Sequence, residues 1–172
     1  MRDGRTVEVG AIGIEGIAGI QGLLGIDSAT ECIVQVPGAA LCGNPDALRS
    51  EVGRNRNLAV LFQSYYHLII SQIAQTAACN RLHSLEQRCC RWLLIAHDSA
   101  RSDSFPLTHE FLSMMLGVQR ASVSIAAKTL QEAGLIRYFR GQMTITDRTG
   151  LEATACECFD TIRRLTDRLF RK

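Results

Sequence analysis

The sequence lacks the features that mark several large classes of protein. No apolar run approaches the roughly 20 residues that a membrane-crossing helix needs, so we expect no membrane-spanning segment. The seven cysteines are an odd number at irregular spacings, which argues against a secreted disulfide framework and favours reduced thiols in a cytoplasm. The formal net charge is only +2, too small for a protein that coats nucleic acid without regard to sequence.

Proline is missing where the chain is richest in glycine. Glycine falls at every third position from Gly10 to Gly25, but the repeat is short and carries no proline, which excludes a collagen helix. No Gly-Lys-Ser or Gly-Lys-Thr step follows, so the segment is not a P-loop. Residues 6–12 and 29–36 lie on either side of the repeat, and their apolar patterns predict two β-strands.

No arrangement of catalytic residues stands out either. The sequence offers no serine–histidine–acid or cysteine–histidine set and no paired carboxylates that would serve the glycine-rich segment. The four histidines show no ligand spacing with one another. On one helix, Cys156 and Cys158 would point about 200° apart, which makes a poor chelate. We therefore expect no enzymatic activity, no cofactor and no metal site.

The most informative stretch of the sequence is residues 107–146. Apolar residues recur at helical spacing on both sides of Gly117. They are Leu112, Met115 and Leu116 before it, and Val123, Ala126, Ala127 and Leu130 after it. The two alanines allow two helices to cross closely, and Gly117 can adopt the positive φ of a sharp turn. This pattern predicts a helix-turn-helix, whose second helix would present its outer face to a DNA major groove.

The outer face of that second helix is polar and has no acidic residue before Glu132. Arg120 lies in the first turn, and its guanidinium fork suits O6 and N7 of guanine. Ile125 can pack against a thymine methyl group, and a hairpin with Arg140 at its tip follows, as a wing would. The predicted DNA-binding residues are Thr108, Gln119, Arg120, Ser122, Ser124, Ile125, Lys128 and Arg140.

Positive charge is concentrated in the same stretch. From Gln119 to Arg148, five lysines or arginines stand against Glu132 and Asp147, an excess of three positive charges. The first hundred residues carry eight basic and nine acidic residues, a net charge of −1. The excess therefore lies where a phosphate backbone would dock. The simpler alternative is a compact helical pair with a solvated polar face.

Residues 54–82 predict a long helix with a heptad seam. The seam residues, mostly apolar, follow one another at alternating spacings of three and four, which is the pattern of a helix that pairs with another helix. The predicted dimer interface consists of Leu58, Leu61, Tyr65, Leu68, Gln72 and Gln75. The two glutamines would fix the register of the pair at some cost in stability. A core helix within one chain is the competing interpretation. A shorter helix is predicted from Leu85 to Ala100, and a last one begins at Asp147 or Thr149.

The order of these parts resembles the Crp/Fnr family of bacterial transcription regulators. The resemblance rests on the glycine-rich residues 13–19, on residues 29–36, and most specifically on residues 108–146. It implies an α+β fold with a partial β-roll of the cyclic-nucleotide-binding type, a long dimerisation helix and a C-terminal winged helix-turn-helix. The corresponding domains are residues 1–53, 54–84 and 85–172. Because only the first of these precedes the long helix, we expect the chain to begin inside the roll, as a fragment or a late start codon would.

The resemblance also implies a function. A Crp/Fnr regulator binds a two-fold operator in double-stranded DNA as a homodimer, each second helix contacting one half-site, and RNA polymerase is a further partner. Two differences from the family pattern limit what the resemblance implies about ligand and operator. Residues 25–30 hold Asp27 and no arginine to pair with a cyclic phosphate, so cyclic nucleotide binding is not expected. On the second helix only Arg120 carries over, since Ala121 follows it and Ile125 stands one turn on, which predicts a different operator. The alternative function is a dimeric protein-interaction module that does not contact DNA.

Overall fold

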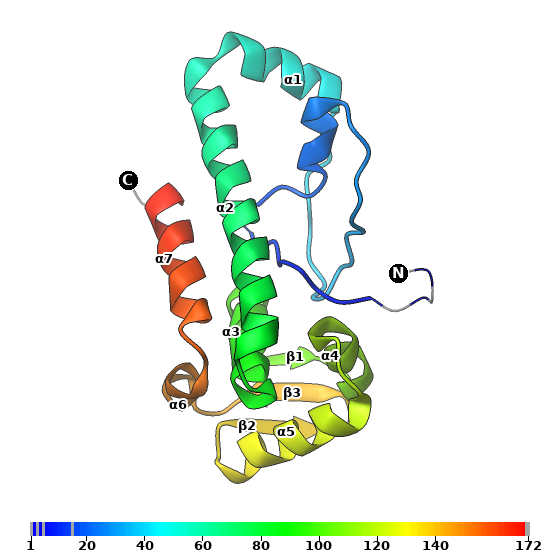
Figure 1. Cartoon of the computed structure of the whole chain (residues 1–172), viewed down its shortest axis with the longest axis vertical. Helices are drawn as coiled ribbons and strands as arrows, with labels where there is room; N and C mark the ends of the chain where they lie inside the picture. The colour runs from blue at the N-terminus through cyan, green and yellow to red at the C-terminus, as the bar shows by residue number, and fades with distance from the viewer. Residues whose placement is uncertain (1, 3, 5, 15, 171–172) are drawn as a thin grey trace.

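One long helix forms the axis of the molecule. The computed structural model describes residues 2, 4, 6–14 and 16–170. Figure 1 shows α2 (Arg56–Leu82) running along most of the long axis, with α1 (Pro45–Arg54) turned away at its upper end. The chain then reverses into α3 (Leu85–Ala100). Within the described residues, no helix is both long enough and apolar enough to cross a membrane.

Helix boundaries follow from capping side chains. The Asn44 side chain accepts hydrogen bonds from the first turn of α1, whose first residue is Pro45. The Asn55 side chain accepts from the backbone N–H of Leu58 and begins α2. Ser84 forms a reciprocal capping box with Gln87 at the start of α3. The caps at Asn55 and Ser84 thus mark the bend before α2 and the reversal after it (Figure 1).

The C-terminal half surrounds a small antiparallel sheet. Its strands are β1 (Ser104–Pro106), β2 (Ile136–Phe139) and β3 (Gln142–Ile145), in the order β1-β3-β2. Helices α4 (His109–Leu116), α5 (Arg120–Glu132) and α6 (Arg148–Thr154) pack around the sheet together with α3. Leu93, Leu112, Val123, Met143 and Leu151 are fully buried at the centre of this core. The mixed helix and sheet architecture that the sequence predicts is therefore confirmed.

The two strands predicted in residues 6–12 and 29–36 are wrong in detail. Neither stretch forms a strand, and the described residues before Pro45 hold one short helical turn, η1 (Ile20–Leu24). A strand pair in water is marginal unless further strands or a helix cover its apolar face. The first stretch instead contacts α4, because the backbone N–H of Glu8 donates to the carbonyl of Met115 at 3.1 Å. The part that resembles a β-roll is thus irregular chain with one helical turn in the described residues.

The last helix predicted by the sequence is divided into two. Asp147 accepts a hydrogen bond from Gly150 N–H and begins α6, as predicted. The helix stops at Ala155, which is extended (ψ 157°), and α7 (Cys158–Phe170) begins after it. This break lets α7 turn and run beside α2 (Figure 1).

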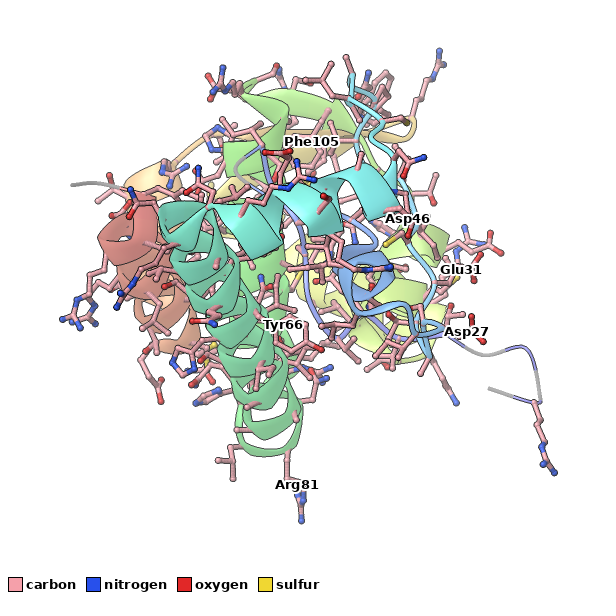
Figure 2. The ribbon with its side chains drawn as sticks, turned by 90° about the horizontal axis from the view of Figure 1, so that it is seen from above. Asp27, Glu31, Asp46, Tyr66, Arg81 and Phe105 are labelled. Carbon is pink, nitrogen blue, oxygen red and sulfur yellow. The ribbon has the colours of Figure 1, made fainter. Side chains whose placement is uncertain are left out.

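Figure 2 shows the molecule along its long axis. Asp27, Glu31 and Asp46 lie on the side of the N-terminal segment, whereas Arg81 projects outward from the last turn of α2. These three acidic residues thus lie on a different part of the surface from Arg81 (Figure 2).

Candidate nucleic-acid interface

The turn between α4 and α5 has the geometry that the sequence predicts. The Thr108 hydroxyl accepts from the backbone N–H of Phe111 at 3.1 Å and begins α4. Gly117 ends the helix in the left-handed conformation, with φ 66° and ψ 36°. A Cβ at that position would also lie 3.0 Å from the side chain of Val7. Glycine is therefore required at Gly117 both by its φ and by the contact with the N-terminal segment.

The inner face of the helix-turn-helix is buried as predicted. Leu112, Met115 and Leu116 of α4 are at most 4% exposed. On α5, the buried residues are Val123, Ala126, Ala127 and Leu130. The two alanines lie between bulkier neighbours, which lets α5 pack closely on the core. This packing leaves the opposite face of α5 to solvent.

Three of the predicted DNA-binding residues on α5 are exposed on that outer face. Ile125 is 67% exposed. The Lys128 side chain is 75% exposed, and its ammonium group lies 3.6 Å from the carboxylate of Glu132. Arg120 is exposed, and its guanidinium forms no hydrogen bond or ion pair with any residue that the structure describes. Gln119, also exposed, is the N-cap residue but makes no capping hydrogen bond with its side chain.

The hairpin between β2 and β3 forms the predicted wing. Its two-residue turn has positive φ at both Arg140 (47°) and Gly141 (80°), as in the tight turns that suit hairpins. The Arg140 guanidinium lies 5.1 Å from the centre of the Phe139 ring, and Phe139 is 65% exposed. The sequence analysis missed Phe139, although the alternation along β2 places Arg137 and Phe139 on the side away from the core. The wing tip therefore presents an aromatic ring and a cation together.

Two other predicted contact residues are engaged within the chain. The Thr108 hydroxyl serves as the cap of α4. The Ser124 hydroxyl donates to the Arg120 carbonyl at 3.1 Å and lies 3.0 Å from Nδ1 of His109. Ser122 is half-buried on the same helix. Thr108 and Ser124 thus shape the helix-turn-helix from within.

His109 connects the helix pair to the wing. Its ring stacks on Tyr138 of β2, with ring centres 4.2 Å apart and planes 24° apart. Its Nε2 is buried without a hydrogen-bond partner among the described residues. Burial lowers the pKa of His109, and the nearby Arg120 charge lowers it further. The neutral ring therefore suits this position between α5 and β2.

Arg148 does not contribute to the positive surface, contrary to the charge count from the sequence. Its guanidinium lies 2.6 Å from the Asp98 carboxylate and 3.0 Å from that of Glu152. The same group contacts Nδ1 of His97 at 2.6 Å. These contacts attach the start of α6 to the end of α3, so Arg148 is a structural residue.

The predicted dimer seam is largely covered by the chain itself. Tyr65, Leu68 and Gln72 are at most 8% exposed. The Tyr65 hydroxyl accepts from the backbone N–H of Ile17 at 2.8 Å, and Leu68 belongs to a cluster that includes Leu165 and Leu169 of α7. Gln75 contacts α7 as well, and Leu58 and Leu61 are the more exposed members of the seam. In the middle of the seam, α2 therefore packs as a core helix within one chain, the alternative to the dimer interpretation.

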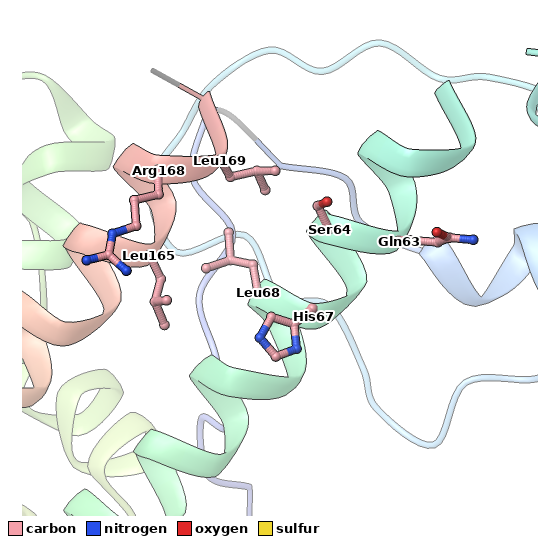
Figure 3. Close-up of a pocket in the computed structure, with 7 residues that line it drawn as sticks. All are labelled: Gln63, Ser64, His67, Leu68, Leu165, Arg168 and Leu169. Carbon is pink, nitrogen blue, oxygen red and sulfur yellow. The ribbon is translucent and has the colours of Figure 1, made fainter. Parts of the chain in front are cut away.

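A groove of about 440 Å³ lies between α2 and α7. Figure 3 shows Leu68, Leu165 and Leu169 between the two helices, with Gln63 and Arg168 pointing away on opposite sides. Ser64 and His67 complete its lining. No set of polar groups converges on the floor of this groove, so its shape does not indicate a small-molecule site.

Comparison with known proteins agrees with this geometry. Residues 87–154 match the family model described as a Crp-like helix-turn-helix domain. FixK2 from Bradyrhizobium japonicum aligns over 65% of this chain, with 15% identity and a TM-score of 0.57. A protein from Eubacterium rectale described as a transcriptional regulator of the Crp/Fnr family aligns over 64% of it, with 21% identity and a TM-score of 0.51. A CooA mutant from Carboxydothermus hydrogenoformans aligns over 63%, with 13% identity and a TM-score of 0.52.

The alignments cover part of each relative. The matched regions amount to 59%, 51% and 53% of those three structures, in the same order. The search of curated proteins finds no significant match. At these identities the solved structures show a common fold, and the resemblance that the sequence carries in residues 108–146 is confirmed by the domain match.

Proposed function

Because residues 87–154 form a Crp-like helix-turn-helix domain, we propose that this chain is a sequence-specific DNA-binding transcription regulator of the Crp/Fnr type and not an enzyme. The single observation that carries the proposal is the outer face of α5. Arg120 and Lys128 extend from it into solvent beside the exposed Ile125. An arginine, a lysine and an exposed apolar residue on one helix face match the chemistry of a major groove.

Each group has a role in the proposed complex. Arg120 donates two hydrogen bonds to O6 and N7 of guanine, and Ile125 packs against a thymine methyl group. Gln119 and Ser122 contact base edges or phosphates at the start of α5, where backbone N–H groups also favour anions. Lys128 and Arg140 bind phosphate oxygens on either side of the groove, and Phe139 packs with Arg140 at the wing tip. Base contacts thus come from α5, and positioning contacts come from the wing.

The regulator acts as a homodimer on a two-fold operator in this proposal. Tyr66, Ile70, Ile73 and Ala77 form an apolar stripe on α2 at steps of four, three and four. Ile70 is 53% exposed and Ile73 is 38% exposed, so much of this stripe stays uncovered in one chain. We place the dimer contact on this α2 stripe, beside the seam that the chain itself covers. The division into residues 1–53, 54–84 and 85–172 then separates a sensor-like segment, a dimer helix and a DNA-binding domain.

The remaining partners follow from the same proposal. A regulator bound beside a promoter meets RNA polymerase, and the chromosome places it in the bacterial cytoplasm. Asp27 is exposed and no arginine accompanies it in residues 25–30, so we expect no cyclic nucleotide response.

The test is the selection of bound sequences from random double-stranded DNA with the full chain. We expect one motif with two inverted halves whose centres are about 10 base pairs, or a multiple of that, apart. Affinity for the selected DNA should fall steeply as salt rises, because released counterions drive much of the binding. Failure to enrich any motif, with no salt-dependent binding, would point to a protein-interaction module instead.

A further inference from the structure

Four potential metal ligands converge where α2 ends and α7 begins. Cys79 and His83 lie in and just after the last turn of α2, and Cys156 and Cys158 flank the start of α7. Their ligand atoms all lie within 4.8 Å of one another. The three cysteines are at most 3% exposed, and the His83 side chain is 17% exposed. The cluster is therefore shielded from solvent on most sides.

Two of the distances match the edges of a metal-centred tetrahedron. The sulfur atoms of Cys79 and Cys156 are 3.5 Å apart, and the Cys158 sulfur lies 3.4 Å from Nδ1 of His83. With metal–sulfur bonds of about 2.3 Å and metal–nitrogen bonds of about 2.0 Å, the edges of such a tetrahedron are about 3.5–3.8 Å. One ion at the centre would thus reach all four atoms with small adjustments.

The chain conformation explains why these four residues meet. Cys79 and His83 are four residues apart, so they lie on the same face at the end of α2. A continuous helix would point Cys156 and Cys158 in different directions. The break at Ala155 removes that constraint, and both sulfur atoms turn toward α2. The expectation of no metal site depended in part on one continuous helix through both cysteines, which this break replaces.

The groups around the cluster are those that support a thiolate site. The Nε2 atom of His83 lies 3.2 Å from the carboxylate of Glu157, the arrangement that orients a metal-binding imidazole through its other nitrogen. The Gln75 side-chain amide donates to the sulfur of Cys158 at 3.1 Å. Such a donor stabilises a sulfur atom that carries negative charge.

Two buried arginines supply positive charge beside the cluster. Arg88 and Arg91 are 8% and 4% exposed, and neither forms an ion pair with a carboxylate among the described residues. Among the residues that the structure describes, neither Nε atom has a hydrogen-bond partner. Both interact electrostatically with Cys79. Burying two such cations is costly without nearby anions, and three thiolates would supply them.

We propose that Cys79, His83, Cys156 and Cys158 bind one Zn²⁺ ion in a structural site that joins α2 to α7. Four protein ligands leave no open position, which distinguishes a structural zinc site from a catalytic one. An iron–sulfur cluster fits poorly, because it spreads its ligands over several irons and needs them farther apart than a single ion does. The ion links residues 79 and 156, far apart in sequence, and replaces the thiol protons with coordinate bonds.

The test is a titration of the full chain, reduced and freed of metal with a chelator, with Co²⁺ and then Zn²⁺. We expect one Co²⁺ per chain, with thiolate-to-cobalt charge transfer and the strong visible absorption of tetrahedral Co²⁺, and displacement by Zn²⁺. His83→Gln, which replaces a half-buried ligand, should keep the fold and bind at least tenfold more weakly, whereas Glu157→Gln should weaken binding about tenfold. Cys158→Ser removes one of the three thiolates, so the thiolate-to-cobalt charge-transfer absorption should lose about a third of its intensity.

The matched control is the double substitution Cys32→Ser and Cys42→Ser, since these are the two exposed cysteines of the chain. It should leave the Co²⁺ spectrum and stoichiometry unchanged. The proposal is overturned if the spectrum is the same in His83→Gln and Cys158→Ser as in the parent chain, or if the exposed cysteines account for it. It is equally overturned if the chain isolated from a reducing cytoplasm holds a Cys79–Cys156 disulfide and no metal.

Discussion

At the scale of single residues, the most consequential position is Gly117. It turns the chain between α4 and α5 with a positive φ, and the side chain of Val7 lies against it. A side chain there would meet both the left-handed strain and a close contact. The orientation of α5, and with it the whole outer face, depends on this one turn.

We predict that Gly117→Ala lowers the free energy of unfolding by about 1–2 kcal/mol, the cost of a left-handed conformation for a residue with a Cβ. Urea denaturation monitored by circular dichroism measures the change. Gly38→Ala is the matched control, because Gly38 has an ordinary φ and open space around it, and it should be close to neutral. Equal stabilities of the two variants would show that the turn does not require glycine.

His109 makes the stability of the domain depend on pH. Its pKa in the folded state is lowered, first by burial and then by the Arg120 charge, so the unfolded chain takes up a proton at a higher pH than the folded one. The contribution of His109 to stability is therefore fully present above about pH 6.5, the ordinary pKa of histidine. It is lost progressively as the pH falls below that value. The neutral ring is the form that stacks on Tyr138.

The corresponding measurement compares urea unfolding at a series of pH values between 7.5 and 5.5, roughly one unit to each side of the ordinary histidine pKa. We predict that His109→Phe, which keeps an aromatic ring on Tyr138, loses part of the decline seen in the parent chain. His67→Gln should retain the full decline, because His67 is exposed on α2. A parent-like slope in His109→Phe would mean that other groups cause the pH dependence.

At the scale of elements, the wing and α5 have different roles in the proposed DNA complex. The wing presents Arg140 and Phe139 at its tip, while the outer face of α5 presents Arg120 and Ile125. Phosphate contacts carry little sequence information, whereas contacts with base edges carry most of it. Substitutions in the two elements should therefore change different properties of the complex.

For the wing we predict that Arg140→Ala weakens binding to all DNA sequences by a similar factor and leaves the selected motif unchanged. The slope of log affinity against log salt should decrease by about one, since one phosphate contact is lost. Fluorescence anisotropy at several salt concentrations measures both quantities. A change in base preference would instead assign Arg140 to the bases.

For α2 we predict that Ile70→Glu dissociates the proposed homodimer, because it places a charge in the middle of the apolar α2 stripe. Light scattering coupled to size-exclusion chromatography reports the mass at each protein concentration. Leu82→Glu is the control, as Leu82 is 75% exposed at the end of α2, outside the stripe. A dimer that survives Ile70→Glu would place the contact elsewhere.

The elements also show how far local sequence patterns determine this structure. The helix-turn-helix and wing could be predicted because caps, a turn glycine and apolar spacing all act within a few residues of one another. The pairing of α2 with α7 could not be predicted, since a heptad seam such as Tyr65 and Leu68 is equally suited to a helix of the same chain or of another. The strands before Pro45 were predicted wrongly, because strand formation depends on partners that the local pattern does not reveal.

At the scale of the whole molecule, three parts of the chain meet around α2. The N-terminal segment contacts it through the bond between Ile17 and Tyr65, and reaches α4 through Glu8. Glu8 also accepts hydrogen bonds from the Trp92 indole and the Gln35 amide, at 2.8 Å and 2.5 Å. The half-buried Glu8 carboxylate thus anchors the N-terminal segment to the C-terminal half, and α7 covers the other side of α2.

This arrangement gives the molecule a continuous path from the N-terminal segment to the outer face of α5. Val7 lies against Gly117, the turn that orients α5, and Glu8 bonds to the last turn of α4. A change in the N-terminal segment would therefore act first on the helix-turn-helix. The proposed DNA-binding face of α5 is therefore held in place by the N-terminal segment as well as by the core of its own domain.

The most direct measurement of the central claim compares Arg120→Ala with Arg54→Ala on the selected operator. Both arginines are exposed, but Arg54 ends α1 at the opposite end of the molecule from α5 (Figure 1). We predict that Arg120→Ala loses about 1–3 kcal/mol of discrimination at one base pair in each half-site, whereas Arg54→Ala binds as the parent chain does. If Arg120→Ala keeps the affinity and the base preference of the parent chain, α5 is not the helix that recognises DNA.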